Sequence, residues 1–269
     1  MTSQPSRRGE PQPPDPLPIP VVDNHTHLDI SREGVAVTVD DLGPVLAAAA
    51  AVGVDRVVQI GCDLPGARFA VEAADRYAGV LAGVALHPNE VPALAASGGL
   101  AAAYAEIERL ASGPRVRVVG ETGLDYYRTG PEGVPAQQDS LRWHIDLAKR
   151  LDRTLQIHDR DSHDDVLRVL AEEGAPDRTV MHCFSGGPEM ARECAQRGYH
   201  LSFSGTVTFK SSKTLRDALA VTPLELLLVE TDAPYLTPHP WRGATNSPAL
   251  VPLTVRAMAS VLGVAVPTL

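Results

Sequence analysis

The stretch IPVVDNHTHLD, residues 19–29, joins a short apolar run to two histidines. An apolar run without polar alternation is typical of a strand buried on both faces, as in a parallel sheet. Residues i and i+2 of a strand point to the same side, so the imidazoles of His25 and His27 can converge on one ion. The stretch therefore predicts a parallel α/β fold with a metal-type site where its first strand ends. Two surface histidines flanking a turn are the alternative.

Seven more apolar, β-branched runs follow along the chain, and helical patterns separate them. Strands are expected over residues 19–25, 55–61, 80–86, 116–121, 154–159, 179–184, 199–205 and 226–232. Helices are expected over residues 41–51, 65–77, 99–112, 136–150, 162–173, 187–197, 211–220 and 248–262. Eight βα units in 269 residues predict a closed (β/α)8 TIM-like barrel. A doubly wound open sheet is the alternative, but no GxGxxG follows the first strand, so a dinucleotide site lacks support.

Composition narrows the class of protein. The formal net charge of −9 argues against a protein that coats nucleic acid non-specifically, although metal charge is absent from that count. The three cysteines form no CxxC pair, which fits a reducing compartment and predicts a cytoplasmic location. No apolar run approaches the ~18 residues of a membrane span, so no membrane association is expected.

The first residues differ in composition from the rest. Residues 1–19 are rich in proline and lack the apolar stretch of a signal peptide. We therefore expect a flexible N-terminal tail over residues 1–19 and one barrel domain over residues 20–269.

Residues of metal-binding type recur where the expected strands end. They are His25, His27, His87, Glu121, His158, His182 and Asp232. In a parallel barrel all these ends lie on one rim, and that rim carries the active site. Nitrogen and oxygen ligands without thiolates suit Zn²⁺, Mn²⁺, Co²⁺ or Ni²⁺, and Mg²⁺ less naturally.

Two carboxylates are the expected catalytic residues. Glu121 follows a buried strand, where a carboxylate is costly unless it is paired or bound to metal, and its two oxygens could bridge two cations. An exposed loop glutamate is the alternative. Asp232 is interpreted as a ligand and general base, which would accept a proton from an attacking water. Glu230 is interpreted as a residue that steers a ligating histidine, and a buried partner for an arginine is the alternative.

The segment IHDRDSHDD supplies a further histidine and an arginine. His158 follows the strand pattern directly and is favoured as a ligand, whereas His163 is expected to face solvent. Arg160 lies two residues on and could bind a substrate phosphate or carboxylate. An ion pair of Arg160 with Asp159, Asp161 or Asp165 is the alternative.

Taken together, the motifs resemble the TatD family of metal-dependent hydrolases, often described as deoxyribonucleases. The matching stretches, in order, are DNHTHLD, GVALHPNE, GETGLDYY, IHDRD, MHCFSG and ETDAPYLTP, from about residue 21 to residue 255. The resemblance implies a TIM-like barrel of the metal-dependent hydrolase type with two divalent ions. It also implies nuclease action, including 3′→5′ exonuclease action, and for some members deacylation of D-aminoacyl-tRNA.

The resemblance assigns a role to each site residue. It implies that His25, His27 and Asp232 hold the first ion. His158 and His182 would hold the second, and Glu121 would bridge both. His87 would lie near the substrate phosphate.

The chain departs from the family pattern in three places. It carries Leu141 and His144 where the family usually has Phe and Gln, which we interpret as packing changes. The segment WRGATNSPALV keeps Arg242, Asn246 and Pro248 but differs in the middle. The chain ends at VPTL, where relatives usually continue through another short helical segment.

The predicted function is hydrolysis of phosphodiester bonds in nucleic acid, with DNA as the expected partner. Two metal ions would activate a water, and no obligate protein partner is expected. One alternative keeps the metals but cleaves an aminoacyl-tRNA ester, an amide or a lactone. Many amidohydrolases bridge their metals with a carboxylated lysine, where this chain has Glu121, which favours the TatD family. The other alternative is a metal-binding scaffold that engages partners through its proline-rich tail.

Overall fold

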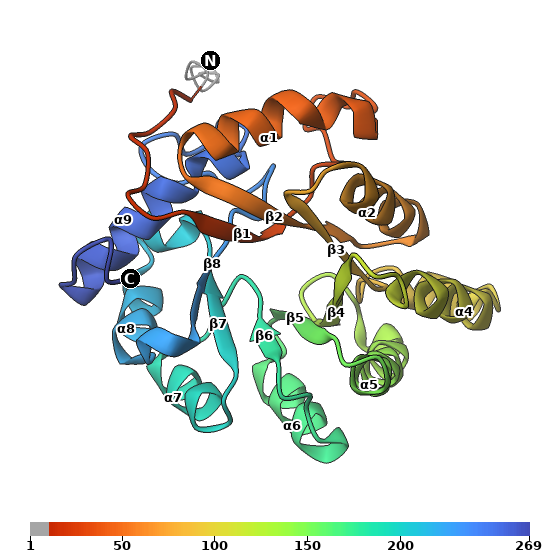
Figure 1. The fold of residues 1–269 in the computed structure, drawn as a ribbon. Coiled ribbons are helices and arrows are strands. Elements are labelled where there is room, and N and C mark those ends of the chain that lie inside the picture. The colour runs from red at the N-terminus through yellow and green to blue at the C-terminus, as the bar shows by residue number, and fades with distance from the viewer. Residues whose placement is uncertain (1–10) are drawn as a thin grey trace, which may run out of the picture.

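Eight parallel strands form the inner ring of the protein. The computed structural model describes residues 11–269; residues 1–10 lie outside it. The strands are β1 (Val21–Thr26), β2 (Val54–Gly61), β3 (Val80–Val84), β4 (Val116–Asp125), β5 (Thr154–Arg160), β6 (Thr179–Met181), β7 (His200–Phe203) and β8 (Leu227–Val229). They pair in sequence order, each with the next, and the chain runs once around the ring (Figure 1). The predicted (β/α)8 barrel is confirmed.

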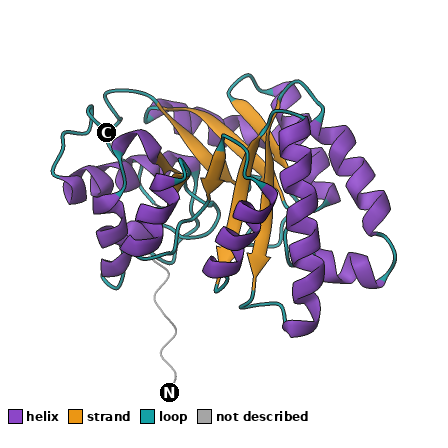
Figure 2. Ribbon diagram, turned by 90° about the horizontal axis from the view of Figure 1, so that it is seen from below, coloured by secondary structure: helices purple, strands orange, loops and turns teal. Residues whose placement is uncertain are grey.

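Helices lie outside the strands and cover the ring. Within residues 11–269 they are α1 (Leu42–Ala51), α2 (Leu64–Arg76), α3 (Val91–Ala96), α4 (Leu100–Ala111), α5 (Val134–Arg150), α6 (His163–Glu173), α7 (Pro188–Gln196), α8 (Lys213–Val221) and α9 (Val251–Leu262). Figure 2 shows the strands as the inner layer with helices flanking them. None of these helices combines the length and the apolar character needed to cross a membrane.

The eight strands differ from the expected strands mainly at their ends. β4 continues to Asp125, four residues beyond the expected end, so Glu121 lies inside the strand and does not close it. β6 and β8 are shorter than expected, so His182 and Asp232 follow their strands. Helix α3 was not expected, because its six residues are too few to show a helical period.

The seam between β8 and β1 closes only at the carboxyl end of the barrel. There a single parallel bridge joins Thr26 to Ala233, and the backbone N–H of Asp232 donates to the carbonyl of His25 at 2.9 Å. The buried carboxylate of Asp23 accepts from the backbone N–H of Thr231 at 2.8 Å and from its hydroxyl at 2.6 Å. A side chain thus replaces part of the missing ladder and ties β1 to the segment that carries Asp232.

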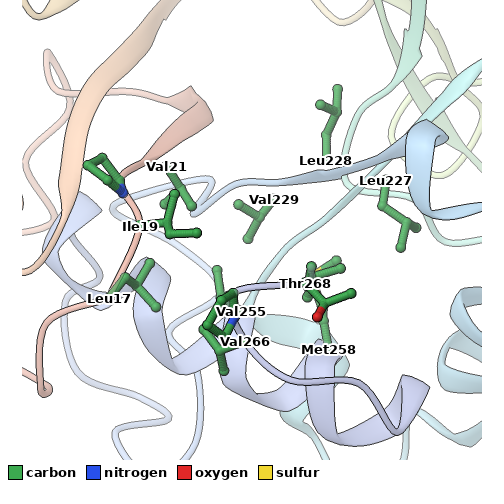
Figure 3. A pocket seen from close by; sticks show the side chains of 13 residues that line it. Leu17, Ile19, Val21, Leu227, Leu228, Val229, Val255, Met258, Val266 and Thr268 are labelled. Carbon is green, nitrogen blue, oxygen red and sulfur yellow. The ribbon is translucent and has the colours of Figure 1, made fainter.

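At the other end of the seam, strands β1 and β8 leave a cavity of about 210 Å³. Figure 3 shows Val21 from β1, Leu227 and Val229 from β8, and Val255 and Met258 from α9 around it. The cavity is far from the histidine-bearing strand ends. Helix α9 therefore covers the part of the seam where no ladder joins the strands.

The interior of the barrel is filled by few apolar side chains. Val58, Ile60 and Val118 form their own cluster, separate from the larger core between strands and helices. Gly83 permits this packing, because a Cβ there would lie 2.4 Å from Ile60 Cδ1. Buried polar and ionisable residues, among them His25, Glu121 and His182, lie at the carboxyl end.

Part of the predicted N-terminal tail packs on the barrel. Leu17 is buried, and its backbone N–H donates to the carbonyl of Val52 at 3.0 Å. Arg256 of α9 donates to the carbonyls of Asp15 and Pro16. Burial of one leucine, one backbone–backbone hydrogen bond and two hydrogen bonds from the Arg256 side chain hold this segment in place. The expected flexibility of residues 1–10 lies outside the described residues, and the division of the chain at residue 20 stays a prediction.

His144 on α5 is fully buried and joins the helix to the segment that follows β3. One ring nitrogen, Nδ1, donates to the carbonyl of Ser140 at 2.8 Å, and the other, Nε2, accepts from the backbone N–H of Leu86 at 3.2 Å. One donating and one accepting nitrogen require the neutral ring. Burial lowers the pKa of His144 to about 4, despite the opposing hydrogen bond to Ser140.

We expect His144 to make the protein sensitive to acid. The unfolded chain protonates this histidine near its ordinary pKa of 6.5, whereas the folded chain resists protonation down to about 4. Stability is therefore lost as the pH falls from 6.5 to 4, and at pH 5 the loss is roughly 2 kcal/mol. A His144→Gln variant keeps a donor and an acceptor without titrating, so urea unfolding of chelator-treated protein at pH 7 and pH 5 should show a smaller loss for the variant. Equal losses would contradict this role.

Candidate metal centre

All six predicted metal ligands meet at the carboxyl end of the barrel. They come from β1, β4 and β5 and from the residues that follow β1, β6 and β8: His25, His27, Glu121, His158, His182 and Asp232. Glu121 lies within 3.8 Å of a ring nitrogen of each of the four histidines, and Asp232 lies within 3.9 Å of His25 and His27. His25 and Asp232 are 207 positions apart in the sequence, so the fold brings distant residues together. Their role as ligands stays a prediction.

The first group consists of His25, His27 and Asp232. The two Nε2 atoms lie 3.1 Å apart, and Asp232 Oδ1 lies 3.3 Å from His27 Nε2 and 3.9 Å from His25 Nε2. Ligands held 2.0–2.2 Å from a tetrahedral ion lie about 3.4 Å from one another. The three atoms therefore have the mutual spacing that one cation requires.

Asp232 reaches this position through an unusual backbone conformation. Its φ is 55°, in the left-handed region that aspartate and asparagine tolerate better than most residues. The turn begins directly after Thr231, which is bonded to Asp23. The seam of the barrel therefore positions the carboxylate of Asp232.

Glu121 faces two groups of histidines with its two oxygens. Oε2 lies 3.5 Å from His25 Nε2 and 3.8 Å from His27 Nε2. Oε1 lies 2.5 Å from His158 Nδ1 and 3.4 Å from His182 Nε2. One oxygen thus belongs to the first group and the other to a second, which is the arrangement of a carboxylate that can serve two cations.

Two of the histidines have a hydrogen-bonding partner at Nδ1, and a third has an ion-pair contact there. The contacts are Gln156 Oε1 to His25 at 2.8 Å, the carbonyl of Ile60 to His27 at 3.0 Å, and Glu230 Oε1 to His182 at 3.0 Å. With Nδ1 engaged, Nε2 of each ring is left to face the centre. Glu230 contacts His182, and its role in steering a ligating histidine stays a prediction.

His158 is turned the other way. Its Nδ1 faces Glu121, and its Nε2 lies 3.3 Å from Asp125 Oδ2. Asp125 is itself held by Asn89 Nδ2 at 3.0 Å and by the backbone N–H of Arg128 at 2.8 Å. Nδ1 is therefore the nitrogen that His158 presents to the second group.

The close approach of β4 and β5 places Glu121 beside His158. Gly123, two residues after Glu121, has a φ of 146°, and a Cβ there would lie 1.9 Å from the carbonyl oxygen of His158. Only glycine fits this contact. A residue with a side chain would force the strands apart and separate the carboxylate from the imidazole.

The charges of the group influence one another. Burial alone would raise the pKa of Glu121, but the imidazoles of His182, His87 and His158 outweigh burial and hold the pKa well below its ordinary value. Burial opposes protonation of His158, but Glu121 and Asp125 raise its pKa to about 9. Protons on such histidines balance the carboxylates, and a bound cation would displace them.

The two predicted substrate-binding residues lie beside the second group. His87 Nε2 is 3.6 Å from Glu121 Oε1, and the His87 ring packs edge-on against His158 with centroids 4.5 Å apart. Arg160 ends β5, and its guanidinium lies 4.0 Å from the centroid of the Tyr127 ring. Both side chains are therefore near the site, and their contact with substrate stays a prediction.

Sequence reasoning missed several residues that orient the group. Gln156 and Asp23 each lie two positions before a histidine of the same strand, and both are fully buried. The available signal was a polar residue two positions before a predicted ligand on a buried strand, because both side chains then point to the same side. Asp125 gave no such signal, because the expected strand stopped at Glu121.

Cys62 was also missed as a neighbour of the group. Its Sγ lies 3.5 Å from Glu121 Oε2 and 3.8 Å from His27 Nδ1. Burial raises the pKa of the thiol to about 12, so the thiol keeps its proton and can donate to the carboxylate.

A (β/α)8 barrel with histidines and carboxylates gathered at the carboxyl ends of its strands is the architecture of metal-dependent hydrolases. The family model described as TatD related DNase matches residues 22–269, so the chain belongs to this family. It is a metal-dependent hydrolase of the TatD family, as the resemblance implied.

Similar proteins and structures agree with this family. The chain is 49% identical over 246 residues to the uncharacterized metal-dependent hydrolase TatD of Mycobacterium tuberculosis, covering 90% of each chain. It is 39% identical over 249 residues to the uncharacterized metal-dependent hydrolase YcfH of Escherichia coli, covering 91% of this chain and 89% of that one. The crystal structure of YjjV, a TatD homologue from Escherichia coli, superposes with a TM-score of 0.81 at 26% identity and 92% coverage of both chains.

Proposed function

We propose that this protein is a deoxyribonuclease of the 3′→5′ exonuclease type, which hydrolyses phosphodiester bonds in DNA. The observation that carries the proposal is Glu121, whose two oxygens face two separate sets of histidines. The description of the family as TatD related DNase supports DNA as the substrate. We further propose a cytoplasmic location and activity without an obligate protein partner.

The donor set fits two divalent cations. His25, His27 and Asp232 would hold one, and His158 and His182 the other, with Glu121 shared. Nitrogen and oxygen donors favour Zn²⁺, Mn²⁺, Co²⁺ or Ni²⁺ over Mg²⁺. Such cations, when bound, make a water molecule more acidic and stabilise the charge that develops on a phosphate.

The protein's own residues complete the chemistry. The carboxylate of Asp232 accepts the proton of the attacking water, because burial, which would raise its pKa, is outweighed by His27 and His182 and the group stays ionised. His87 and Arg160, on the side of the second group, bind phosphate oxygens and orient the ester. Gln156 and Glu230 keep the imidazoles aligned.

Elemental analysis combined with a chelator-controlled nuclease assay tests the proposal. The purified protein should contain divalent metal and should shorten single-stranded DNA labelled at its 5′ end, one nucleotide at a time from the 3′ end. Chelator should abolish this activity, and Mn²⁺, Co²⁺, Ni²⁺, Zn²⁺ or Mg²⁺ added singly should show which ions restore it.

A D-aminoacyl-tRNA serves as the competing substrate in the same assay. Deacylation of this ester without cleavage of DNA would overturn the nuclease proposal and leave the hydrolytic site in place. A metal-loaded protein that cleaves neither substrate would instead support the scaffold alternative.

A further inference from the structure

Tyr127 lies exposed at the rim of the barrel, next to the candidate metal centre. It follows β4 by two residues, and its side chain is 65% exposed. The backbone N–H of Tyr126 donates to the carbonyl of Arg160 at 2.9 Å, which holds the end of β4 against the end of β5. The guanidinium of Arg160 covers one face of the Tyr127 ring at 4.0 Å. Much of the ring is therefore exposed beside this contact.

The stacked pair stands directly above the second histidine group. Gln156, His158 and Arg160 alternate along β5, so their side chains point to the same side. Gln156 contacts His25 inside the barrel, and His158, two residues nearer the carboxyl end of β5, contacts Glu121. Two residues of a strand span about 6.6 Å, so Arg160 and the tyrosine stacked on it lie one such step beyond His158.

The guanidinium of Arg160 is not neutralised by a neighbouring acid. Within residues 11–269 no ion pair joins it to a carboxylate, although three aspartates lie nearby in sequence. Asp159 instead contacts His163 at 2.7 Å, and Asp165 contacts Arg168 at 2.8 Å and the hydroxyl of Tyr126 at 2.7 Å. The charge is therefore available to an anionic ligand, while the aromatic ring offers a flat apolar face.

Two exposed tyrosines lie near the carboxyl ends of the strands. Among the tyrosine, phenylalanine and tryptophan residues of the described part of the chain, the exposed ones are Tyr127 and Tyr235. Tyr235 lies three residues after Asp232, to whose carbonyl its backbone N–H donates at 2.9 Å. An exposed aromatic ring can stack on a nucleobase, and the unpaired guanidinium of Arg160 beside Tyr127 can bind the attached phosphate.

We propose that Tyr127 and Arg160 form a base-stacking subsite at the edge of the candidate metal centre. The base next to the reacting phosphate stacks on the exposed ring of Tyr127, and Arg160 contacts the adjoining phosphate. The position of this base beside a reacting phosphate rests on the proposed nuclease function, but the stacking contact itself does not.

The test compares Tyr127→Ala with Tyr127→Phe, which keeps the ring and removes only the hydroxyl. Loss of one stacked base should raise KM for a single-stranded oligodeoxynucleotide roughly ten-fold or more in Tyr127→Ala, with little change in kcat. Tyr127→Phe should behave as the wild type. An oligonucleotide that is abasic at the terminal nucleotides should be cleaved equally by all three proteins, because it has no base to stack.

Binding measured without cleavage separates this proposal from the nuclease proposal. Chelator-treated proteins are titrated with a fluorescein-labelled oligodeoxythymidylate, and its anisotropy should show weaker binding by Tyr127→Ala alone. If the wild type binds in this Tyr127-dependent way but cleaves no DNA, the subsite stands and the nuclease proposal fails. Equal KM and equal binding by Tyr127→Ala and the wild type, or an equal loss on the abasic substrate, would overturn the subsite.

Discussion

Asp232→Asn should lower kcat for DNA hydrolysis by about 10²–10⁴-fold while leaving the fold intact. Asparagine keeps the shape of the side chain and tolerates the φ of 55° at this position. Its amide cannot accept the proton of the attacking water. The contacts that build the turn, from Asp232 N to the carbonyl of His25 and from Thr231 to Asp23, do not involve the replaced oxygen. Circular dichroism should therefore match the wild type.

Metal content decides how a loss of activity in Asp232→Asn is interpreted. Each protein should be assayed across a range of metal concentrations, with bound metal determined by elemental analysis. Asp55→Asn is the matched control, because Asp55 is an exposed carboxylate near the amino end of β2, away from the centre. Wild-type kcat in fully metal-loaded Asp232→Asn would rule out the role of Asp232 as general base.

Glu121→Gln should remove one of the two cations and reduce activity below detection. A neutral amide offers a single acceptor oxygen, whereas the carboxylate faces histidines with both. The first group would retain His25, His27 and Asp232, but the second would be left with two histidines. Bound metal should therefore fall by one equivalent per chain, and loss of the second group should abolish the alignment of the ester.

The measurement for Glu121→Gln is metal stoichiometry by elemental analysis after equilibrium dialysis, followed by the nuclease assay at saturating metal. Glu225→Gln serves as the control, since Glu225 lies in a short 3-10 helix on the far side of β8 from Asp232. A Glu121→Gln protein that binds as much metal as the wild type would show that the carboxylate does not join two sites.

Much of the candidate metal centre could be predicted from local sequence, because polar residues at the ends of apolar strands are easily recognised. His25 and His158 lie near the ends of predicted buried strands, where a polar residue needs a partner or an ion. The hydrophobic period and the position of a residue relative to an apolar run are local properties of the sequence, so they can be read without knowledge of the fold. Gln156 and Asp23 could have been found in the same way, since both are polar and in step with a histidine.

Other features depended on contacts that no local pattern encodes. The seam between β1 and β8 is closed by Asp23 and Thr231, which lie 208 residues apart in sequence. The orientation of His158, with Nδ1 toward Glu121 and Nε2 toward Asp125, follows from the approach of β4 to β5 at Gly123. The stack of Arg160 on Tyr127 also joins two separate strand ends.

The sequence by itself determined the barrel, the family and the residue types at the carboxyl ends of the strands, because the period of the strands and the order of the motifs are properties of the linear sequence. Only the tertiary structure decided which oxygen of Glu121 faces which histidines and which charges remain unpaired. Those properties depend on distances of a few ångströms between strands, and such distances are set by packing in three dimensions, not by spacing in sequence.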